Sequence, residues 1–226
     1  MNPKMDAAPR PYQPWECGWL PNETLRRAIT GVLSYARGQL LDVGSGRQPY
    51  RELFQPYITS YTALDRPSAQ YYYALTTCYG DALALPFRAG SFDTLLAFEV
   101  LEHLPDPQRF FSEVARVLAP GGCLLLTTPH IWGLHDEPYD FYRFTPHGLR
   151  TLCERQGLCP LVLEPVAGYW VTTGARFSYY LHRFRRLRGL AESCAQLGVQ
   201  QAALLADRLD FVPSDAWNHI LVARRS

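Results

Sequence analysis

One run of seven residues, Leu-Leu-Asp-Val-Gly-Ser-Gly at positions 40–46, constrains the fold of this chain more than any other. Its apolar residues predict a buried strand that ends at an acidic residue and enters a glycine turn, where glycine accepts backbone angles that a Cβ would forbid. A second acidic residue, Asp65, stands at the end of the next predicted strand. This pairing is typical of a nucleoside site on an α/β sheet, where a carboxylate holds the ribose hydroxyls.

Apolar runs alternate with amphipathic segments along the first 128 residues, which predicts a parallel, doubly wound sheet. The first helix is expected to be capped by Asn22, because Leu25 to Ala36 place their apolar residues on one helical face. The predicted strands are 39–43, 61–64, one within 71–79, 94–98, 123–127, 161–165 and 216–224; the other predicted helices are 49–54, one from Pro107, 145–156 and an insert over about 170–210.

Length and composition predict one globular domain. We expect residues 1–24 to form a flexible segment and residues 25–226 the domain. A net charge of +1 gives no sign of a nucleic-acid binder. The six cysteines include no C-x-x-C pair, which favours reduced thiols and a cytoplasmic location. No apolar run approaches the length of a membrane span, and no motif specifies an oligomeric state.

Six motifs occur in the order and spacing of one known family. They are Leu-Asp-Val-Gly-Ser-Gly, the acidic residue after the second strand, Gly-Asp-Ala before Leu-Pro-Phe, Ser-Phe-Asp, Glu-Val-Leu-Glu-His-Leu and Leu-Ala-Pro-Gly-Gly-Cys-Leu. The chain thereby resembles the class I S-adenosylmethionine-dependent methyltransferases, in particular the type 11 group. The resemblance implies a Rossmann-like, mostly parallel seven-stranded sheet with an antiparallel C-terminal closing strand. The chain departs from the family at Gln48, where members usually carry a third glycine.

The resemblance also implies which residues hold S-adenosyl-L-methionine. Asp65 would accept the ribose hydroxyls, and Asp81 and Ala82 would meet the adenine edge. An adenine face would be covered by Arg66, by Leu83 or by groups near Tyr61. The methionine part would lie over the glycine turn, with its amino group received by Asp42 through water. The implied cofactor contacts are Asp42, Gly44, Ser45, Gly46, Asp65, Arg66, Asp81, Ala82, Phe98 and Glu99.

Methyl transfer to a hydroxyl benefits from a general base. His130 and His135 are the preferred candidates, because their loop leaves the carboxyl end of the fifth strand. His103 is a weaker one, since its position favours a structural role, fixing the loop after the fourth strand. A metal site built from His130, His135, Asp136 and Glu137 matches no metal signature, so no metal is predicted. Arg143 is expected to pair with a carboxylate or to hold an anionic substrate.

The acceptor is expected to be an oxygen or nitrogen atom of a small molecule, a sugar or a lipid-linked glycan. A basic aromatic patch from Arg176 to Arg188 is either a solvated helix face or a surface for peripheral contact with anionic lipid. A second hypothesis is a non-catalytic module that binds the cofactor and recruits a partner. A nicotinamide dehydrogenase is disfavoured, because the first strand ends in D-x-G-x-G rather than G-x-G-x-x-G.

Overall fold

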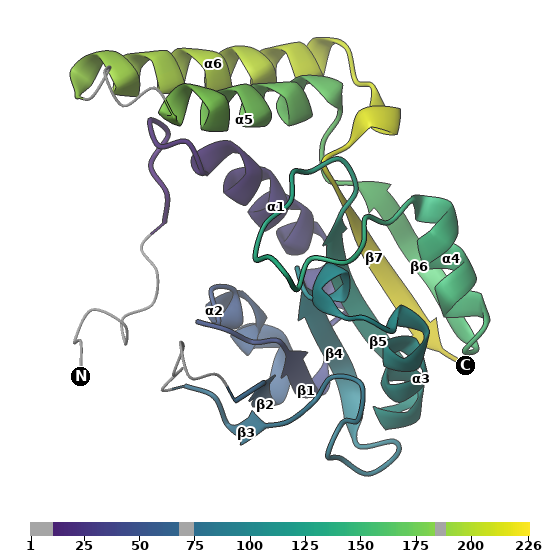
Figure 1. Cartoon of the computed structure of the whole chain (residues 1–226). Coiled ribbons are helices and arrows are strands. Elements are labelled where there is room, and N and C mark those ends of the chain that lie inside the picture. Colours follow the sequence, from purple (N-terminus) through teal and green to yellow (C-terminus); the bar gives the residue numbers. More distant parts are fainter. Residues whose placement is uncertain (1–10, 68–74, 184–188) are drawn as a thin grey trace.

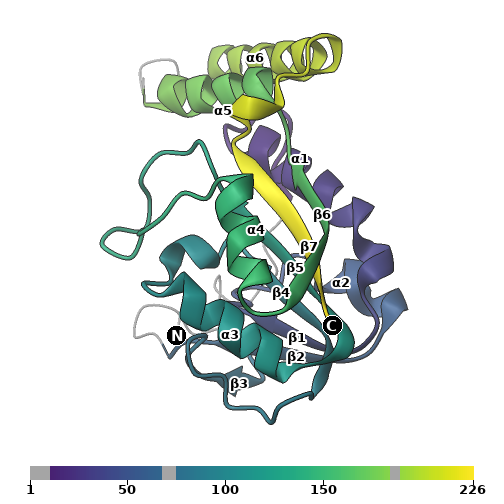
Figure 2. The ribbon, with the colours of Figure 1, turned by 90° about the vertical axis from the view of Figure 1, so that its right-hand side faces the viewer.

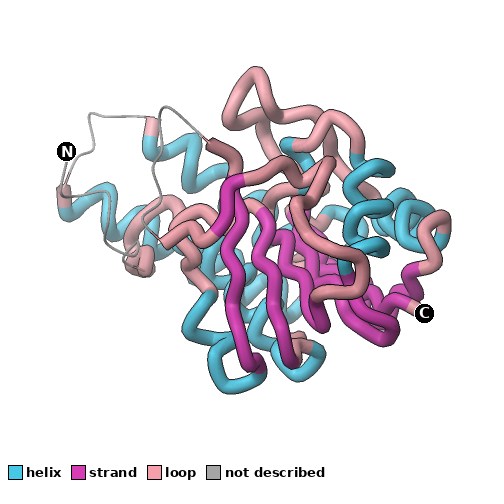
Figure 3. The backbone as a smooth tube through the Cα atoms, turned by 90° about the horizontal axis from the view of Figure 1, so that it is seen from below, coloured by secondary structure: helices cyan, strands magenta, loops and turns pink. Residues whose placement is uncertain are grey.

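A seven-stranded sheet with helices on both faces forms the centre of the molecule (Figures 1 and 3). The computed structural model describes residues 11–67, 75–183 and 189–226. The strand order is β3-β2-β1-β4-β5-β7-β6, with β7 antiparallel to both of its neighbours and the other pairs parallel. The predicted Rossmann-like architecture is therefore confirmed. The strands are β1 Gly38–Val43, β2 Ile58–Asp65, β3 Cys78–Tyr79, β4 Phe92–Phe98, β5 Leu118–Pro129, β6 Leu158–Pro165 and β7 Asn218–Arg225.

The sheet is buried on both faces, as its continuous apolar strands require. Successive side chains of a strand point to opposite faces, so Leu40 and Leu41 enter two different core clusters. Helices α3 (Pro107–Val117) and α4 (Pro146–Glu154) cover one face, and α1 (Trp19–Gly31) and α2 (Arg51–Phe54) cover the other (Figure 2). This arrangement leaves the carboxyl ends of the parallel strands open to form a site.

Helix α1 begins earlier than the sequence predicts. It starts at Trp19 with Gly18 as its N-cap, and Asn22 lies inside the helix, where its Nδ2 donates to the carbonyl of Gly18 at 2.8 Å. The expectation that Asn22 caps the helix is therefore wrong. The N–H of Leu20 donates instead to Oε1 of Gln200 at 2.9 Å, a contact between distant parts of the chain. The boundary expected between residues 24 and 25 falls within α1, and residues 1–10 lie outside the described part.

Two antiparallel helices, α5 (Tyr169–His182) and α6 (Leu190–Leu209), follow β6 in the region that the sequence predicts to be helical (Figure 1). They approach closely at Gly174, where a Cβ would come 2.4 Å from the Cβ of Ala203. Of the basic patch, Arg176 and Arg183 are described, whereas residues 184–188 lie outside the described residues. Within the described chain, no helix combines the length and apolar character needed to cross a membrane.

Four single turns of 3-10 helix, η1 Leu33–Tyr35, η2 Gln55–Tyr57, η3 Leu101–His103 and η5 Pro213–Asp215, complete the described elements. The turn η3 begins two residues after β4 and holds Leu101-Glu102-His103 of the Glu-Val-Leu-Glu-His-Leu motif. The loop after β5 arches outward between α5 and α4 (Figure 2). Both segments lie at the carboxyl edge of the sheet, next to the strands that precede them.

Candidate functional site

The turn after β1 has the backbone geometry that its glycines predict. Gly44 and Gly46 adopt φ angles of +66° and +50°. A Cβ on Gly44 would come 2.5 Å from Cγ2 of Val100, so the turn also packs too closely for any other residue. Ser45 between them is buried, and its N–H donates to the carbonyl of Leu64 at 3.1 Å. The turn therefore presents bare backbone at the sheet edge.

Asp65 at the end of β2 faces this turn. Its Oδ2 accepts the N–H of Gly46 at 2.8 Å, and its Oδ1 accepts the N–H of Arg66 at the same distance. The carboxylate is thereby fixed beside the turn while each oxygen keeps a free lone pair. That is the geometry expected of an acceptor for two neighbouring hydroxyls.

Gln48 replaces the glycine that related turns usually carry, yet it adopts the left-handed conformation with φ +53°. Its side chain is buried: Nε2 donates to the carbonyl of Leu75 at 2.7 Å, and Oε1 accepts from Nη1 of Arg51 at 3.0 Å. These bonds offset the cost of the unusual angle. Gln48 thus keeps the turn in shape and ties it to the chain that leads into β3.

Asp42 lies beneath the turn and is almost fully buried. Its pKa is raised to about 7, chiefly because burial disfavours the charged carboxylate; the charge of Asp65 adds to the shift. The hydroxyl of Tyr61 donates to Oδ2 of Asp42, which opposes the shift. A positively charged group placed near Asp42 would stabilise its carboxylate form.

The raised pKa of Asp42 predicts a pH-dependent stability. The pKa of Asp42 is about 7 in the folded protein and 3.8, its ordinary value, in the unfolded chain, so the folded protein holds this proton more tightly. The contribution of Asp42 to the free energy of unfolding is therefore full below about pH 4 and is lost as the pH rises towards about 7. The variant Asp42→Asn should therefore lose less free energy of unfolding than the wild type between about pH 5 and pH 8, with a difference of about 2–3 kcal/mol. Urea unfolding at several pH values measures this, and parallel pH profiles would contradict it.

The remaining predicted cofactor residues lie around the same edge. Asp81 is exposed, and its Oδ1 accepts the N–H of Leu83 at 2.9 Å, while Ala82 is buried. Phe98 at the end of β4 stacks on Phe54, with ring centroids 6.1 Å apart. The structure thus places every predicted cofactor residue at the carboxyl ends of β1, β2 and β4 or on the chain after β3.

Glu99 and Glu102 follow β4 as two buried carboxyl groups. Oε1 of Glu99 accepts from Nδ2 of Asn218 at 2.7 Å, and Glu99 itself has a φ of +56°. Oε2 of Glu102 accepts from Oγ1 of Thr128 at 3.2 Å. Burial raises the pKa of both carboxyl groups, and the charge of Glu99 raises that of Glu102 further. Glu102, Thr128 and Asn218 belong to the site but were not predicted from the sequence.

The loop after β5 is braced by an ion pair. Arg143 donates from Nη1 to Oδ1 of Asp140 at 2.6 Å and from Nη2 to Oδ2 at 2.7 Å, and this guanidinium holds the pKa of Asp140 well below its usual range. The same Oδ2 accepts the N–H of His135 at 3.0 Å. The expected pairing of Arg143 with a carboxylate is present, and it fixes the position of His135.

The three predicted histidines do not form one cluster. The rings of His103 and His135 lie with centroids 5.0 Å apart. His130 instead lies 5.1 Å from the ring of His219 on β7. Burial, together with the charge of His130, lowers the pKa of His219 to about 4, so His219 is neutral near pH 7. His219 is a further residue that the sequence did not single out.

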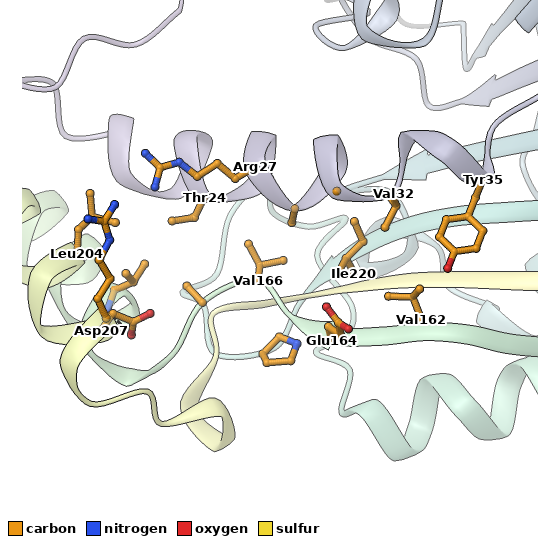
Figure 4. A pocket seen from close by; sticks show the side chains of 16 residues that line it. Thr24, Arg27, Val32, Tyr35, Val162, Glu164, Val166, Leu204, Asp207 and Ile220 are labelled. Atoms are coloured by element: carbon orange, nitrogen blue, oxygen red, sulfur yellow. Dashed lines mark hydrogen bonds between the residues drawn. The ribbon is translucent and has the colours of Figure 1, made fainter. Parts of the chain in front are cut away.

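Two cavities flank this region. One of about 860 Å³ lies between the loop and α5, with aromatic and cationic walls: Tyr12, Trp132, Gly133, Leu134, His135, Asp136, Arg176, Tyr179, Tyr180 and Arg183. The other, of about 610 Å³, lies between α1, β6 and α6, with Arg27, Glu164 and Asp207 among its walls (Figure 4). No predicted site residue lines the second cavity. The first adjoins His135 and is the better candidate for an acceptor.

Comparison with known proteins identifies the central part of the chain. Residues 41–126, from β1 through β5, match the family model described as a methyltransferase domain. This central part of the chain is thus similar to a methyltransferase domain. The ubiquinone biosynthesis O-methyltransferase of Caulobacter sp. (strain K31) is 32% identical over 101 residues, which are 40% of this chain and 40% of that protein. Shorter matches at 44–49% identity cover 14–20% of other curated relatives.

Two solved structures share the fold of this chain over most of its length. An S-adenosylmethionine-dependent methyltransferase from Mesorhizobium loti has a TM-score of 0.61 and 17% identity, covering 91% of this chain and 100% of that one. The [4+2]-cyclase SpnF has a TM-score of 0.61 and 21% identity, covering 92% and 82%. These identities establish the fold alone.

The match to the methyltransferase domain separates the site into two parts. It includes Asp42, the glycine turn, Asp65 and Glu99, whereas His130 and His135 lie beyond residue 126. Most of the predicted cofactor residues thus lie within the matched range. The predicted acceptor residues lie on the loop after β5, outside that range.

Proposed function

We propose that the protein transfers a methyl group from S-adenosyl-L-methionine to an oxygen or nitrogen atom of a small molecule. The observation that carries this proposal is the glycine turn with Asp65 fixed beside it, at the edge where open α/β sheets bind nucleotides. When bound, the sulfonium cofactor supplies an already activated methyl group. Asp65 would hold the ribose, and Asp42 would receive the amino group of the methionine part, which favours the carboxylate form of Asp42.

The proposed acceptor site is the cavity between the loop after β5 and α5. Trp132 and Tyr179 supply an aromatic wall, with their rings 5.6 Å apart and perpendicular. Arg176 and Arg183 supply positive charge from α5. These walls suit an acceptor with an apolar body and an anionic group, and a sugar or lipid-linked glycan carrying a phosphate belongs to that class. Contact of α5 with anionic lipid stays a prediction, and so does the cytoplasmic location favoured by the six free thiols.

The proposed proton acceptor for a hydroxyl substrate is His130. It follows β5 directly, and its backbone N–H donates to the carbonyl of Trp217 at 2.9 Å, which anchors the residue to the strand that carries His219. Because the neighbouring His219 is neutral near pH 7, it places no positive charge against a protonated His130. For a nitrogen acceptor, holding the nucleophile in line with the methyl group supplies much of the rate.

The second hypothesis is a module of this fold that does not transfer methyl groups. Fold alone does not fix function, and Gln48 stands where members of the family usually carry a glycine, so this hypothesis stays open. Calorimetric titration with S-adenosylhomocysteine, with NAD as the control ligand, is the first test. We expect binding of S-adenosylhomocysteine alone, and binding of neither ligand by the folded protein would contradict a cofactor site.

Turnover separates the two hypotheses once binding is established. The protein is incubated with S-adenosylmethionine and a panel of phenolic, amine and phosphosugar acceptors, and S-adenosylhomocysteine is quantified. Acceptor-dependent release supports the transferase. Tight binding with no release above the acceptor-free rate for any member of the panel supports the non-catalytic module.

A further inference from the structure

Three metal-ligating side chains from two separate segments converge beside the proposed methyl-transfer site. Glu102 and His103 come from η3, and His135 comes from the loop after β5. One ligand atom of each lies within 4.8 Å of the others. We propose that this Glu102–His103–His135 cluster binds one divalent transition-metal ion. The sequence predicts no metal site, because only the fold brings η3 and the loop together.

Glu102 provides the first argument. Its side chain is fully buried, and its Oε2 already accepts from Thr128. Its Oε1 is buried and has no hydrogen-bond partner among the described residues, and it points towards Nε2 of His103 at 3.8 Å. A buried carboxylate oxygen without a donor is costly. A metal ion between Glu102 and the two imidazoles would satisfy this oxygen.

The two imidazoles provide the second argument, because their Nδ1 atoms are already engaged. Nδ1 of His103 lies 2.9 Å from the carbonyl of Tyr139, which can only accept, so the proton lies on Nδ1 and Nε2 keeps its lone pair. Nδ1 of His135 lies 3.3 Å from the carbonyl of Gly133 and 3.4 Å from Oδ2 of Asp140. Metal-binding histidines commonly donate their second N–H to a carbonyl or carboxylate in this way.

The charges around the cluster favour a cation. The ionised carboxylate of Asp140 has its Oδ2 3.4 Å from Nδ1 of His135, and the acidic side chain of Glu99 follows β4 three residues before Glu102. The nearby cation, Arg143, has its Nη2 3.5 Å from Nδ1 of His135, on the side of the ring away from Nε2. Its guanidinium is already paired with both oxygens of Asp140. The carboxylate of Asp140 therefore offsets the repulsion that Arg143 would exert on a metal ion in the cluster.

The distances require only a small adjustment. Zinc bonds of about 2.0–2.2 Å place tetrahedral ligand atoms about 3.3 Å apart, so the cluster has to contract by about 1–1.5 Å from its widest separation. The side chains of His103 and His135 are 24% and 34% exposed, which leaves both rings room to turn. Two imidazoles with one carboxylate form a donor set of catalytic zinc and of mononuclear Fe²⁺ sites, with a fourth position open. A hydroxyl of the acceptor bound there would lose its proton more readily.

Titration with Co²⁺ tests this site without any assay of methyl transfer, so its result does not depend on the proposed function. The full-length protein is stripped with a chelator, and Co²⁺ is added at about pH 7.5, where imidazole is mostly neutral. We expect visible absorption bands of a Co²⁺ centre that saturate at one equivalent and are displaced by Zn²⁺. Glu102→Gln and His135→Ala should each weaken binding by at least tenfold, whereas His147→Ala on the exposed face of α4 should leave it unchanged.

Three results would overturn the proposal. They are no saturable Co²⁺ or Zn²⁺ binding by the folded wild type, equal binding by all three variants, and an equal loss in His147→Ala. Thermal unfolding of each variant shows whether it is folded. If Glu102→Gln does not fold, His135→Ala on the surface loop carries the test alone. Failure here leaves binding of S-adenosylhomocysteine unaffected, so the two proposals are judged separately.

Discussion

Replacing Asp65 by alanine should weaken binding of S-adenosylhomocysteine about a hundredfold, equivalent to about 2.7 kcal/mol. Two losses contribute. The ribose would lose hydrogen bonds to an ionised acceptor, each of which contributes about 1.5–3 kcal/mol. In addition, the N–H of Gly46 would lose its 2.8 Å acceptor, so the turn itself would be less well ordered. Calorimetric titration of the wild type and the variant measures the ratio of the dissociation constants.

Two further variants sharpen the experiment on Asp65. Asp65→Asn keeps an oxygen for the N–H of Gly46 but removes the charge, so it should lose less affinity than Asp65→Ala. Glu154→Ala removes an exposed carboxylate at the end of α4 and should bind like the wild type. If Asp65→Ala binds as tightly as the wild type, the ribose is held elsewhere and the assignment fails.

Replacing Gly44 by alanine should destabilise the protein by about 2–4 kcal/mol, the largest stability effect that we expect in the turn. A left-handed backbone angle costs alanine about 1 kcal/mol, and the contact of 2.5 Å with Val100 adds about 1–3 kcal/mol of overpacking. Gly90→Ala is the matched control, because Gly90 has a φ of +69° and no atom within 4 Å of an added Cβ. Gly90→Ala should lose only the stability that the left-handed backbone angle costs alanine, about 1 kcal/mol.

Urea unfolding of both glycine variants gives their free energies of unfolding. In the double variant Gly44→Ala/Val100→Ala, part of the loss should be recovered, because the clashing methyl groups of Val100 are gone. Equal destabilisation by Gly44→Ala and Gly90→Ala would show that the close approach to Val100 contributes nothing.

The cofactor side could be predicted from the sequence because its signals are local. The glycine turn, the acidic strand ends and the alternation of strands and helices each occupy a few consecutive residues, and the parallel fold then brings the strand ends together. The same locality explains the error at Asn22. The side chain of Asn22 is typical of a helix cap, but the start of α1 is stabilised by Gln200 of α6, which is 180 residues away from Leu20 in the sequence.

The contacts that join the segment after β4 to β5 and β7 could not be predicted, because they connect residues that are distant in sequence. Glu99 and Asn218 are 119 residues apart, and Glu102 and Thr128 are 26 apart. Neither pair has a motif that links its members. The pairing of Arg143 with a carboxylate could be predicted, since Arg143 and Asp140 are three residues apart in one loop.

Because β7, the last strand, lies between β5 and β6 in the sheet, the two sides of the proposed site are completed at different stages of synthesis. A nascent chain that has emerged as far as β5 already contains the glycine turn, Asp65 and Glu99. The partner of Glu99, Asn218, arrives only with β7, after the whole of α5 and α6. We therefore expect the cofactor side to form in the growing chain well before the acceptor side is complete, so the two sides of the site form at different times during synthesis on the ribosome.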